Sequence, residues 1–482
     1  MDAIKFGTDG WRGVMRDSLF DETMLLITQS IVNMLKKKNL LERGVIVSYD
    51  TRANSRRIAE RICSLIAANG VKKLYFTTRD TPTPVLSYFI KRHRLGGGLM
   101  ITASHNPPEF NGLKFINHNA GPAVVGETRE IERGIKKPLS PVSSTGILDF
   151  EKARKDGQIR EVKLRGAYLR SLLDMVNPEV FERKRLQVIF DPMYGTTRGY
   201  VDSMLKRLKQ DVRTIHRAPD PKFGGNSPNP IPPNLKDLSE MVVKKKADLG
   251  IACDGDGDRV GIIDDKGEYY GTNAIYPILL YNILKKGERG EIARTVITTR
   301  KVDAIARDFS IALYETPVGS KWLAELSLKK NLLLAGEGTG GLIFRNHIPE
   351  RDGIFTGLKI IEVLMERDTS LSSLSREITR LYGRTVLGEI NVHCENEKQK
   401  ELALDAIRRK ADEFRTIIGA KNQREFDGML FEFSNGSWLH MRPSGTEPFF
   451  RIVAESTSKR ELKTILDKAK EFIANFEIVC GA

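Results

Sequence analysis

Short β-prone runs alternate with stretches that carry apolar residues at helical spacing along most of this chain, which predicts repeated strand–helix units. In residues 1–155 this alternation favours an α/β layer on a mainly parallel or mixed sheet. The same pattern recurs in residues 156–265 and again in residues 266–383. The elements expected in the first region are the helices 22–37, 55–68 and 85–92 and the strands 44–50, 73–77 and 98–102.

The second and third regions repeat the patterning but not the sequence itself. Between the first two regions, the charged segment 136–160 is typical of a linker. Residues 219–233 are rich in Pro, Gly and Asn, which predicts a long irregular loop. The other elements expected here are the helices 168–175, 199–208, 235–246, 274–285, 302–309 and 353–367 and the strands 186–191, 248–253, 295–299 and 332–335.

Residues 384–482 have a different character, because strands follow one another closely and only two long helices are expected. That pattern is typical of a separate α+β domain. The fold class predicted from the whole chain is α/β: three consecutive α/β mixed-sheet domains and a smaller α+β C-terminal domain. The elements expected in the last region are the strands 388–394, 428–433, 437–441 and 449–455 and the helices 399–414 and 459–474.

Length and composition agree with several domains of an ordinary globular protein. A chain of 482 residues exceeds the size at which a single core stops growing, so three or four domains are expected. No apolar run approaches the roughly 20 residues of a membrane span, so no membrane partner is expected. The N-terminus has no signal-peptide pattern. The scattered cysteines (Cys63, Cys253, Cys394 and Cys480) favour a reducing, cytoplasmic location.

The formal net charge of +15 has two interpretations. It could mark a nucleic-acid-binding surface, or it could steer anionic small molecules towards the protein. The lysines are spread along amphipathic helices, as at 36–38 and 244–246, and are not interleaved with aromatic residues. This distribution favours small anions, and no nucleic-acid partner is expected.

One candidate nucleophile lies in the stretch 102–108, Thr-Ala-Ser-His-Asn-Pro-Pro. Asn-Pro-Pro excludes a helix, so Ser104 should lie on a tight, exposed turn after a strand. Residues 111–115 are expected to form a hairpin-like turn that brings Lys114 close. A hydroxyl next to His105 and Lys114 is a plausible nucleophile site. The alternative is a turn that only ends a strand.

A cluster of three carboxylates, Asp254, Asp256 and Asp258, predicts a site for a hard cation such as Mg²⁺. Glycines between them allow sharp turns, and alternation turns all three to one side. A calcium loop is excluded, because Arg259 stands where that loop needs Gly and the flanks look like strands. A simple charged turn is a poor alternative, because three adjacent carboxylates repel one another without a cation.

Two further loops carry candidate chemistry. Residues 336–341, Gly-Glu-Gly-Thr-Gly-Gly, match the dinucleotide pattern GxGxxG, but the β-like segment 342–344 follows where a dinucleotide fold needs a helix. NAD binding is therefore rejected. Residues 442–446, Arg-Pro-Ser-Gly-Thr, offer a guanidinium, two hydroxyls and backbone N–H groups, as in a compact anion site. A plain Pro-Ser-Gly turn is the alternative.

Arg12 and Arg52 are candidate anion contacts near the first region's loops. Each could equally be a surface arginine, and we favour that interpretation for Arg52.

Four motifs in this order, TASHNPPEFNGLK, DGDGDR, GEGTGG and RPSGTEP, resemble the signature loops of the α-D-phosphohexomutase family. That family includes phosphoglucomutases, phosphomannomutases and phosphoglucosamine mutases. The N-terminal FGTDGWRG at 6–13 also fits, so the resemblance spans nearly the whole chain. It implies the same four domains, 1–155, 156–265, 266–383 and 384–482, around a central cleft.

The resemblance also implies roles for individual residues. Ser104 would carry the transferred phosphate, and one Mg²⁺ per chain would be ligated by Ser104's phosphate and the three aspartates. Glu337 and Thr339 would bind sugar hydroxyls, and the 442–446 loop would hold the phosphate that is not reacting. The catalytic set is Ser104, His105, Lys114 and Arg12, and the substrate-binding set is Arg259, Thr316, Gly319, Lys321, Glu337, Thr339, His347, Arg351, Arg442, Ser444, Gly445, Thr446 and Arg451.

The sequence departs from the family pattern at informative positions. Arg351 stands where some members carry Lys; arginine is a poor proton carrier, so Lys114 and His105 are the better acid/base candidates, unranked. Thr339 replaces the commoner Ser, and Gly338 replaces Glu, Met or Gln. Gly341 stands where mannose- and glucosamine-type members commonly have His, which favours glucose.

The expected function is interconversion of hexose 1-phosphate and hexose 6-phosphate, with glucose as the preferred sugar. A hexose 1,6-bisphosphate would be the intermediate and activator, and the enzyme would be a monomer or homodimer. The alternatives are a phosphomannomutase, a dual-specificity enzyme, a phosphoglucosamine mutase and a phosphoserine-dependent phosphatase. The second phosphate site argues against the phosphatase.

Overall fold

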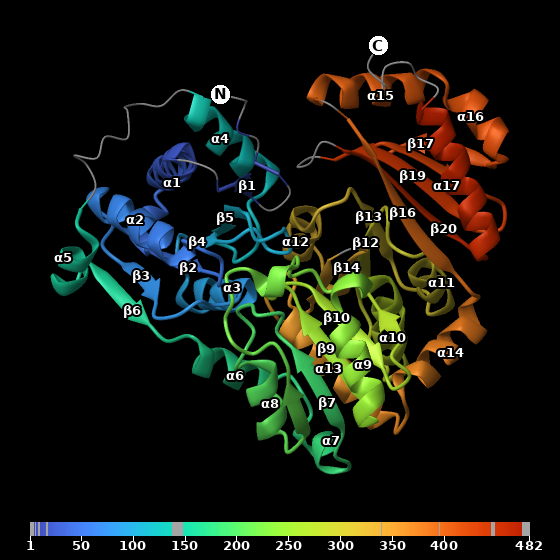
Figure 1. Ribbon diagram of the computed structural model, residues 1–482, viewed down its shortest axis with the longest axis horizontal. Helices are drawn as coiled ribbons and strands as arrows, with labels where there is room; N and C mark the ends of the chain where they lie inside the picture. Colours follow the sequence, from blue (N-terminus) through green and yellow to red (C-terminus); the bar gives the residue numbers. More distant parts are fainter. Residues whose placement is uncertain are drawn as a thin grey trace.

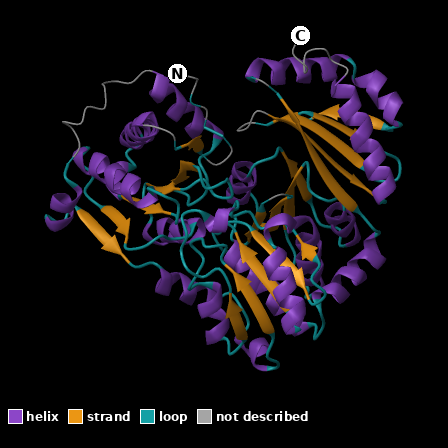
Figure 2. Cartoon of the chain, in the orientation of Figure 1, coloured by secondary structure: helices purple, strands orange, loops and turns teal. Residues whose placement is uncertain are grey.

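Four sheets follow one another along the chain in the computed structural model (Figure 1), which describes residues 4, 6–7, 10–15, 18–136, 148–338, 340–394, 396–444 and 449–474. Helices cover the faces of the first three sheets, while the fourth sheet forms a separate lobe with its own helices (Figure 2). The predicted fold class is confirmed: three mixed-sheet α/β domains precede a smaller domain with an antiparallel sheet.

The first domain has a six-stranded mixed sheet in the order β1-β5-β4-β2-β3-β6. Successive residues of β2 face opposite sides of the sheet, so Val45 and Val47 pack in one core and Ile46 in another. The sheet includes β6, beyond the expected boundary at residue 155. Its elements are β1 (Trp11–Val14), α1 (Ser18–Lys37), β2 (Val45–Tyr49), α2 (Ser55–Ala68), β3 (Leu74–Thr77), α3 (Thr83–His93), β4 (Gly97–Ile101), β5 (Phe110–Asn117), α4 (Val125–Lys136), α5 (Phe150–Lys155) and β6 (Ile159–Val162).

The second domain has a five-stranded sheet in the order β11-β10-β9-β7-β8, in which β7, β8 and β9 are parallel. The turn from β9 into the antiparallel β10 contains the three aspartates. Its elements are α6 (Arg165–Leu173), α7 (Pro178–Glu182), β7 (Gln187–Asp191), α8 (Val201–Arg207), β8 (Asp211–Thr214), α9 (Lys236–Lys245), β9 (Leu249–Cys253), β10 (Val260–Asp264) and β11 (Tyr269–Tyr270).

The third domain has a four-stranded sheet in the order β13-β12-β14-β15, and only β15 is antiparallel to its neighbour. Because β15 follows the Gly-rich loop directly, no helix begins there and the rejection of a dinucleotide fold is confirmed. Its elements are α10 (Thr272–Lys285), β12 (Glu291–Thr295), α11 (Lys301–Asp308), β13 (Leu313–Thr316), α12 (Ser320–Lys329), β14 (Leu332–Glu337), β15 (Gly341–Phe344), α13 (Gly353–Glu366) and α14 (Leu371–Tyr382).

The fourth domain has a wholly antiparallel sheet in the order β16-β20-β19-β18-β17, and helices pack against it. Its elements are β16 (Val386–His393), α15 (Glu397–Arg409), α16 (Ala411–Ile418), β17 (Asn422–Glu425), β18 (Met429–Glu432), β19 (Trp438–Pro443), β20 (Phe449–Ser456) and α17 (Lys459–Ala474).

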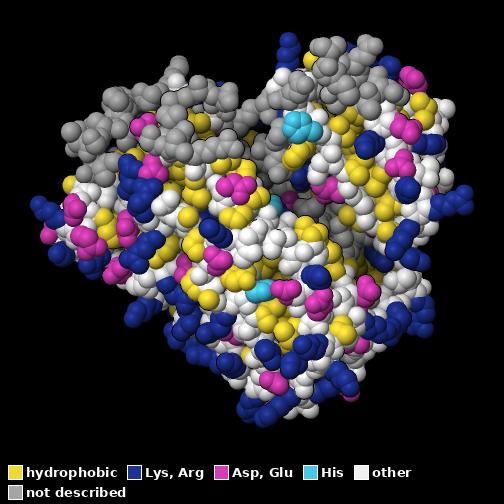
Figure 3. Space-filling view, viewed as in Figure 1, with side chains coloured by type: hydrophobic (Ala, Val, Ile, Leu, Met, Phe, Trp, Pro, Cys, Tyr) yellow, Lys and Arg dark blue, Asp and Glu magenta, His cyan; other side chains and the backbone are white. Residues whose placement is uncertain are grey.

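The first three domains share one apolar core, whereas the fourth joins them through a smaller cluster. The shared core contains Ile90 from the first domain, Tyr200 from the second and Leu279 from the third. The cluster beside the fourth domain joins third-domain residues such as Val318 to Trp438 and its neighbours. The visible surface is hollowed between the first and fourth domains, and Lys and Arg are frequent on its lower and outer parts, with Asp and Glu between them (Figure 3).

Three expected elements differ from the structure. Residues 111–115 are not a hairpin turn but the middle of β5, because β1 and β4 pair with both of its edges. The strand expected at 295–299 instead covers Glu291–Thr295, and a turn follows. The helix expected at 399–414 is two helices that meet at Lys410.

His440 is a buried ring in β19 whose protonation should control the acid stability of the fourth domain. Its Nε2 donates to the carbonyl oxygen of Phe426 (3.1 Å), and Nδ1 has no hydrogen-bond partner among the described residues. Burial lowers the pKa of His440 to about 4, so the ring is neutral at neutral pH.

We predict that the fourth domain loses stability as the pH falls from 7 to 5. The unfolded histidine takes up a proton near its ordinary pKa of 6.5, while the folded ring resists protonation until about 4. The stability due to the neutral ring is therefore complete above that ordinary pKa and falls by about 2 kcal/mol between pH 7 and 5. Urea unfolding followed by tryptophan fluorescence should show this loss in wild type and not in His440→Gln, whose amide also donates to Phe426. Equal losses in the two proteins would contradict the prediction.

Candidate active site

Ser104 lies directly after β4, where a cation and a hydroxyl hold its backbone in an uncommon conformation. Its φ is +52°, in the left-handed region that a side chain rarely adopts. Its N–H donates to Thr102 Oγ1 (2.8 Å), and its carbonyl accepts from Arg52 (2.7 Å). The Ser104 hydroxyl donates to Asp254 Oδ2 at 2.8 Å. The strained turn therefore presents the serine to the aspartate loop of the second domain.

Arg52 is not a surface arginine, so that interpretation was wrong. Its side chain is fully buried beside Asp50, and its Nε donates to Asp50 Oδ2 (3.1 Å). The guanidinium also donates to four backbone carbonyls of the serine loop, at 2.6 to 2.9 Å: those of Ser104, Asn106, Pro107 and Phe110. A five-donor fork can satisfy so many acceptors, and no other side chain could replace it. The position of Asp50-Thr51-Arg52 directly after β2 was the only sequence signal.

The carboxylate of Asp50 completes this support. It accepts from the hydroxyls of Ser55 (2.7 Å) and Thr102 (2.6 Å), and Thr102 in turn accepts from the Ser104 N–H. Burial raises the pKa of Asp50, although Arg52 and these hydroxyls oppose the rise. The serine loop is thus tied on both sides of Ser104 to a single buried ion pair.

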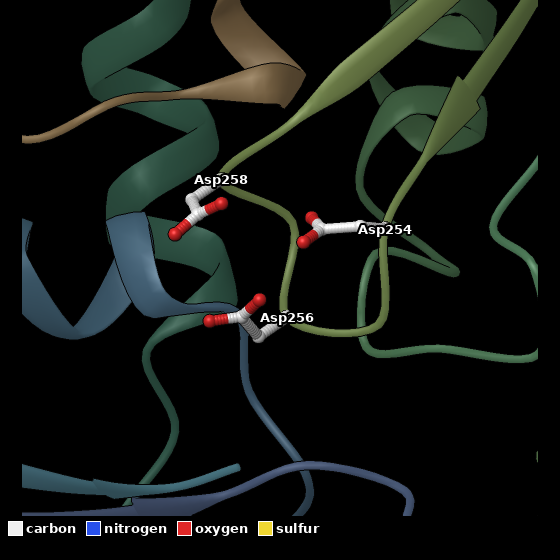
Figure 4. A group of neighbouring side chains, drawn as sticks. All are labelled: Asp254, Asp256 and Asp258. Atoms are coloured by element: carbon white, nitrogen blue, oxygen red, sulfur yellow. The ribbon is translucent and has the colours of Figure 1, made fainter. Parts of the chain in front are cut away.

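Asp254, Asp256 and Asp258 lie on one turn after β9, and their carboxyl groups face a shared space (Figure 4). All three are fully buried, and each offers an oxygen within 4.8 Å of the others. Burial, together with the two neighbouring carboxylates, raises the pKa of Asp254 well above its usual value. The cluster therefore needs positive charge around it.

Lys114 supplies part of that charge from the middle of β5. Its Nζ donates to Asp256 Oδ2 and to Asp258 Oδ2, both at 2.7 Å. Thr83, the first residue of α3, donates from its hydroxyl to Asp256 Oδ2 (2.5 Å), and its N–H donates to the backbone carbonyl of Asp256 (2.8 Å). Burial opposes ionisation of Asp256, but these groups outweigh it and keep the pKa of Asp256 below its usual value. Thr83 was not predicted, although the Thr-Pro-Thr-Pro turn before α3 could have indicated it.

The three aspartates fit a divalent cation. Asp256 Oδ1 and Asp258 Oδ1 are buried and have no hydrogen-bond partner among the described residues. Leaving such oxygens unsatisfied is costly, and a hard cation with oxygen ligands would satisfy them. In the part of the chain that the structure describes, this is the only group of three or more acidic, His or Cys side chains with metal-binding spacing.

Arg351 joins the aspartate loop to the Gly-rich loop of the third domain. Its two terminal nitrogens donate to Asp258 Oδ2 (2.8 Å) and to Glu337 Oε2 (2.7 Å), and the side chain is 2% exposed. Glu337 ends β14 and is buried as well. Thr339 lies outside the described residues. Arg351 therefore links Glu337, the glutamate expected to bind sugar, to the cluster of three aspartates.

His105 lies beside the serine, Arg12 contacts the same loop, and Arg259 lies near His105. His105 Nδ1 lies 3.3 Å from Ser104 Oγ, and Arg12 donates to Asn106 Oδ1 (2.6 Å). Burial and the nearby cations, Arg259 first among them, lower the pKa of His105 well below its usual value. The ring is therefore neutral at neutral pH.

The other predicted residues of the third domain occupy two places. Thr316 ends β13 and Gly319 precedes α12, so a short loop separates Thr316 from Lys321, the second residue of α12. His347, expected as a substrate contact, lies in a separate place. It is buried, its Nε2 is 2.7 Å from Asp352 Oδ2, and Tyr168 also donates to that carboxylate. These contacts tie it to the helix α13, which Asp352 caps, and not to the carboxylate cluster.

The fourth-domain loop is only partly described. Arg442 lies near the end of β19 opposite Arg451 of β20, and Ser444 follows the strand, while Gly445 and Thr446 lie outside the described residues. Arg442 donates to Asp427 Oδ2 (3.1 Å), and Arg451 pairs with Glu389 (3.2 Å). No described contact joins this loop to the aspartate cluster.

Comparison with known families now decides the class of this protein. Models of the four domains of the phosphoglucomutase/phosphomannomutase family match it in order: α/β/α domain I at residues 3–141, domain II at 166–267, domain III at 272–382 and the C-terminal domain at 389–471. The chain belongs to the phosphoglucomutase/phosphomannomutase family. It is thus an enzyme of the phosphohexomutase class, an isomerase, and the predicted resemblance is confirmed.

Similar proteins carry the names of more than one sugar. A phosphoglucomutase/phosphomannomutase of Thermococcus kodakarensis is 28% identical over 96% of each chain. A Methanosphaera stadtmanae protein with the provisional name phosphoglucosamine mutase is 28% identical over 98% of each chain. A solved structure from Thermus thermophilus, provisionally named phosphomannomutase, is 26% identical with a TM-score of 0.83 and covers 98% of this chain and 99% of that one. The substrate is therefore not fixed by these relatives.

The family is Mg²⁺-dependent, which agrees with the aspartate cluster. In addition, no helix among the described residues is long and apolar enough to cross a membrane.

We predict that Arg52→Lys lowers kcat by about 100-fold, because one ammonium cannot hold four carbonyls and the serine would shift from its productive position. Steady-state kinetics should show the loss while circular dichroism stays native. Arg56→Lys is the matched control, because that arginine is exposed and its ion pair is with Glu60 on the same helix face. Wild-type kcat in Arg52→Lys would show that the buried fork does not position Ser104.

We also predict that Mg²⁺ binds at the three aspartates. Calorimetric titration of the metal-free protein should give one site, and Asp258→Asn should weaken it at least about tenfold, because an amide replaces a charged ligand. Asp264→Asn is the control, since that residue lies in the same sheet but outside the cluster. Unchanged affinity in Asp258→Asn would place the metal elsewhere.

Proposed function

We propose that this enzyme interconverts hexose 1-phosphate and hexose 6-phosphate, with glucose as its preferred sugar, through a phosphorylated Ser104. The observation that carries the proposal is the 2.8 Å contact between the Ser104 hydroxyl and the buried aspartate cluster. Three carboxylates alone would repel a phosphoryl group near the Ser104 hydroxyl. The arrangement suits phosphoryl transfer when a cation and basic side chains offset the charge of the phosphoryl oxygens.

In the forward direction, phosphoserine gives its phosphoryl group to the 6-hydroxyl of a bound hexose 1-phosphate. The bond from phosphorus to Ser104 Oγ breaks, a bond to O6 forms, and the O6 proton passes to a base. The hexose 1,6-bisphosphate then rotates end over end in the site. The bond from phosphorus to O1 breaks, a bond from that phosphorus to Ser104 Oγ forms, and the proton held by the base passes to O1. His105, as a neutral ring 3.3 Å from Oγ, is placed to exchange protons at the serine oxygen. A Mg²⁺ on the aspartates would neutralise charge on the transferred oxygens.

The cationic side chains lie in two places, and this arrangement supports the scheme. Lys114 is held between Asp256 and Asp258, so it balances charge at the reacting end. Arg442 and Ser444 would hold the phosphate that is not reacting, which lends remote binding energy to the chemical step. A related N-acetylphosphoglucosamine mutase of Aspergillus fumigatus has been solved with glucose 1,6-bisphosphate, and we propose the corresponding intermediate here.

Glucose is favoured by the space around Gly341. A Cβ atom there would lie 2.6 Å from the carbonyl oxygen of Asp258 and 3.2 Å from Arg351 Cβ. The histidine that mannose- and glucosamine-type members commonly carry at this position would therefore displace the aspartate loop. Phosphoglucosamine mutase activity is the second candidate, because several relatives bear that provisional name. The proposal includes a cytoplasmic monomer or homodimer.

We predict that glucose 1-phosphate is turned over at least about tenfold faster, by kcat/KM, than mannose 1-phosphate or glucosamine 1-phosphate, because one lost hydroxyl contact is worth that much. The assay uses Mg²⁺ and a trace of glucose 1,6-bisphosphate. Ser104→Ala should bind glucose 1-phosphate but not turn it over. Equal rates on glucose 1-phosphate and mannose 1-phosphate would show dual specificity. Activity in Ser104→Ala would refute a reaction through phosphorylated Ser104.

A further inference from the structure

Two loops from different domains meet at one carboxylate, that of Asp427. Its Oδ2 accepts from the backbone N–H of Val318 in the third domain (2.8 Å) and from the Arg442 guanidinium in the fourth (3.1 Å). Val318 belongs to the loop of Thr316 and Lys321, and Arg442 begins the loop of Ser444. One side chain therefore connects the two loops expected to contact substrate from opposite domains.

The backbone fixes Asp427 firmly in this place. It stands in the turn between β17 and β18 with a φ of +53°, which Asp and Asn tolerate better than other side chains. Gly428 follows with a φ of +116°, and a Cβ there would lie 2.4 Å from the carbonyl oxygen of Met441. The turn is thus packed closely against β19, the strand that carries Arg442. The carboxylate is held at a set distance from that arginine.

Apolar, polar and charged contacts surround this carboxylate at the junction of the third and fourth domains. Val318 packs with Trp438 and Val453 in the small apolar cluster. Glu455 of the fourth domain accepts from the N–H of Arg300 (2.9 Å) and from Trp438 Nε1 (2.9 Å). The bond from Arg300 joins the two domains, and the bond from Trp438 holds Glu455 in place for it. Asp427 accepts a hydrogen bond from each of the two loops themselves.

We propose that Asp427 is a positioning residue for the proposed phosphohexomutase reaction, which orients Arg442 for the phosphate that is not reacting and keeps the Val318 loop in register with it. A carboxylate that accepts from one terminal nitrogen restricts the rotation of a guanidinium and leaves its other donors for a phosphate. Arg442 Nε has no hydrogen-bond partner among the described residues, so donors remain on this arginine.

The carboxylate has two opposing effects on an anion. Its charge disfavours a phosphate nearby, while its hydrogen bond orders the arginine that binds the phosphate. Ordering reduces the entropy lost on binding, and a fixed distance between the loops places the sugar relative to the remote phosphate. If ordering prevails, as the geometry indicates, neutralising Asp427 weakens substrate binding although it removes a negative charge.

Two substitutions separate the two contacts. Asp427→Asn keeps the turn conformation and an oxygen for the Val318 N–H but removes the charge that holds Arg442. Asp427→Ala removes the carboxylate and with it both hydrogen bonds. We expect Asp427→Asn to raise KM for glucose 1-phosphate about tenfold with kcat changed less than about threefold, and Asp427→Ala to raise KM further and lower kcat. Asp405→Asn, an exposed residue of α15 in the same domain, is the matched control.

A second measurement does not depend on the sugar. Binding of inorganic phosphate, measured by calorimetry, should weaken in Asp427→Asn, while Mg²⁺ affinity at the aspartate cluster should stay at the wild-type value. If wild type turns over no hexose phosphate, the proposed function fails, and phosphate binding still tests Asp427. Unchanged KM and unchanged phosphate binding, stronger phosphate binding, or a loss confined to kcat would overturn the proposal.

Discussion

Mutual repulsion of three buried carboxylates is the constraint on which the active site depends. Asp254, Asp256 and Asp258 lie within a single turn and are removed from water, which is unfavourable unless positive charge and hydrogen bonds surround them. The chain brings these from other domains: Lys114 from the first and Arg351 from the third. Neutralising the cluster therefore requires the domains to meet, and the shared apolar core of the first three domains keeps them together.

The domains meet at the carboxyl ends of their strands. Ser104 follows β4, the aspartates follow β9 and Glu337 ends β14, so each of the three α/β domains contributes the loop at the carboxyl end of one strand. Ligands of open α/β sheets commonly bind at such ends. The fourth domain has no such strand end in the cluster, and its proposed phosphate contacts, Arg442 and Ser444, lie at the end of β19. It is also the domain with the smaller apolar junction, so it is the part best able to change position.

Local chemistry made part of this structure predictable. The prolines after Ser104 determine the turn by their own geometry, and alternating Asp and Gly determine the carboxylate loop. The residues that escaped prediction act over long range. Arg52 bonds to carbonyls more than fifty positions away in sequence, and nothing in its neighbours reveals them. Lys114 seemed to follow an Asn-Gly turn, but pairing of β5 on both edges overrides that local preference.

Arg351 has a consequence for how ligands influence one another. Its guanidinium divides its donors between Glu337, the proposed sugar contact, and Asp258, one of the proposed metal ligands. A cation that neutralises Asp258 weakens the attraction of that carboxylate for the guanidinium, and the arginine then interacts more strongly with Glu337. Metal and sugar affinities are thereby linked through a shared partner, and thermodynamics requires the coupling factor to be the same in both directions. The proposed sugar site would for that reason change its affinity when the metal binds.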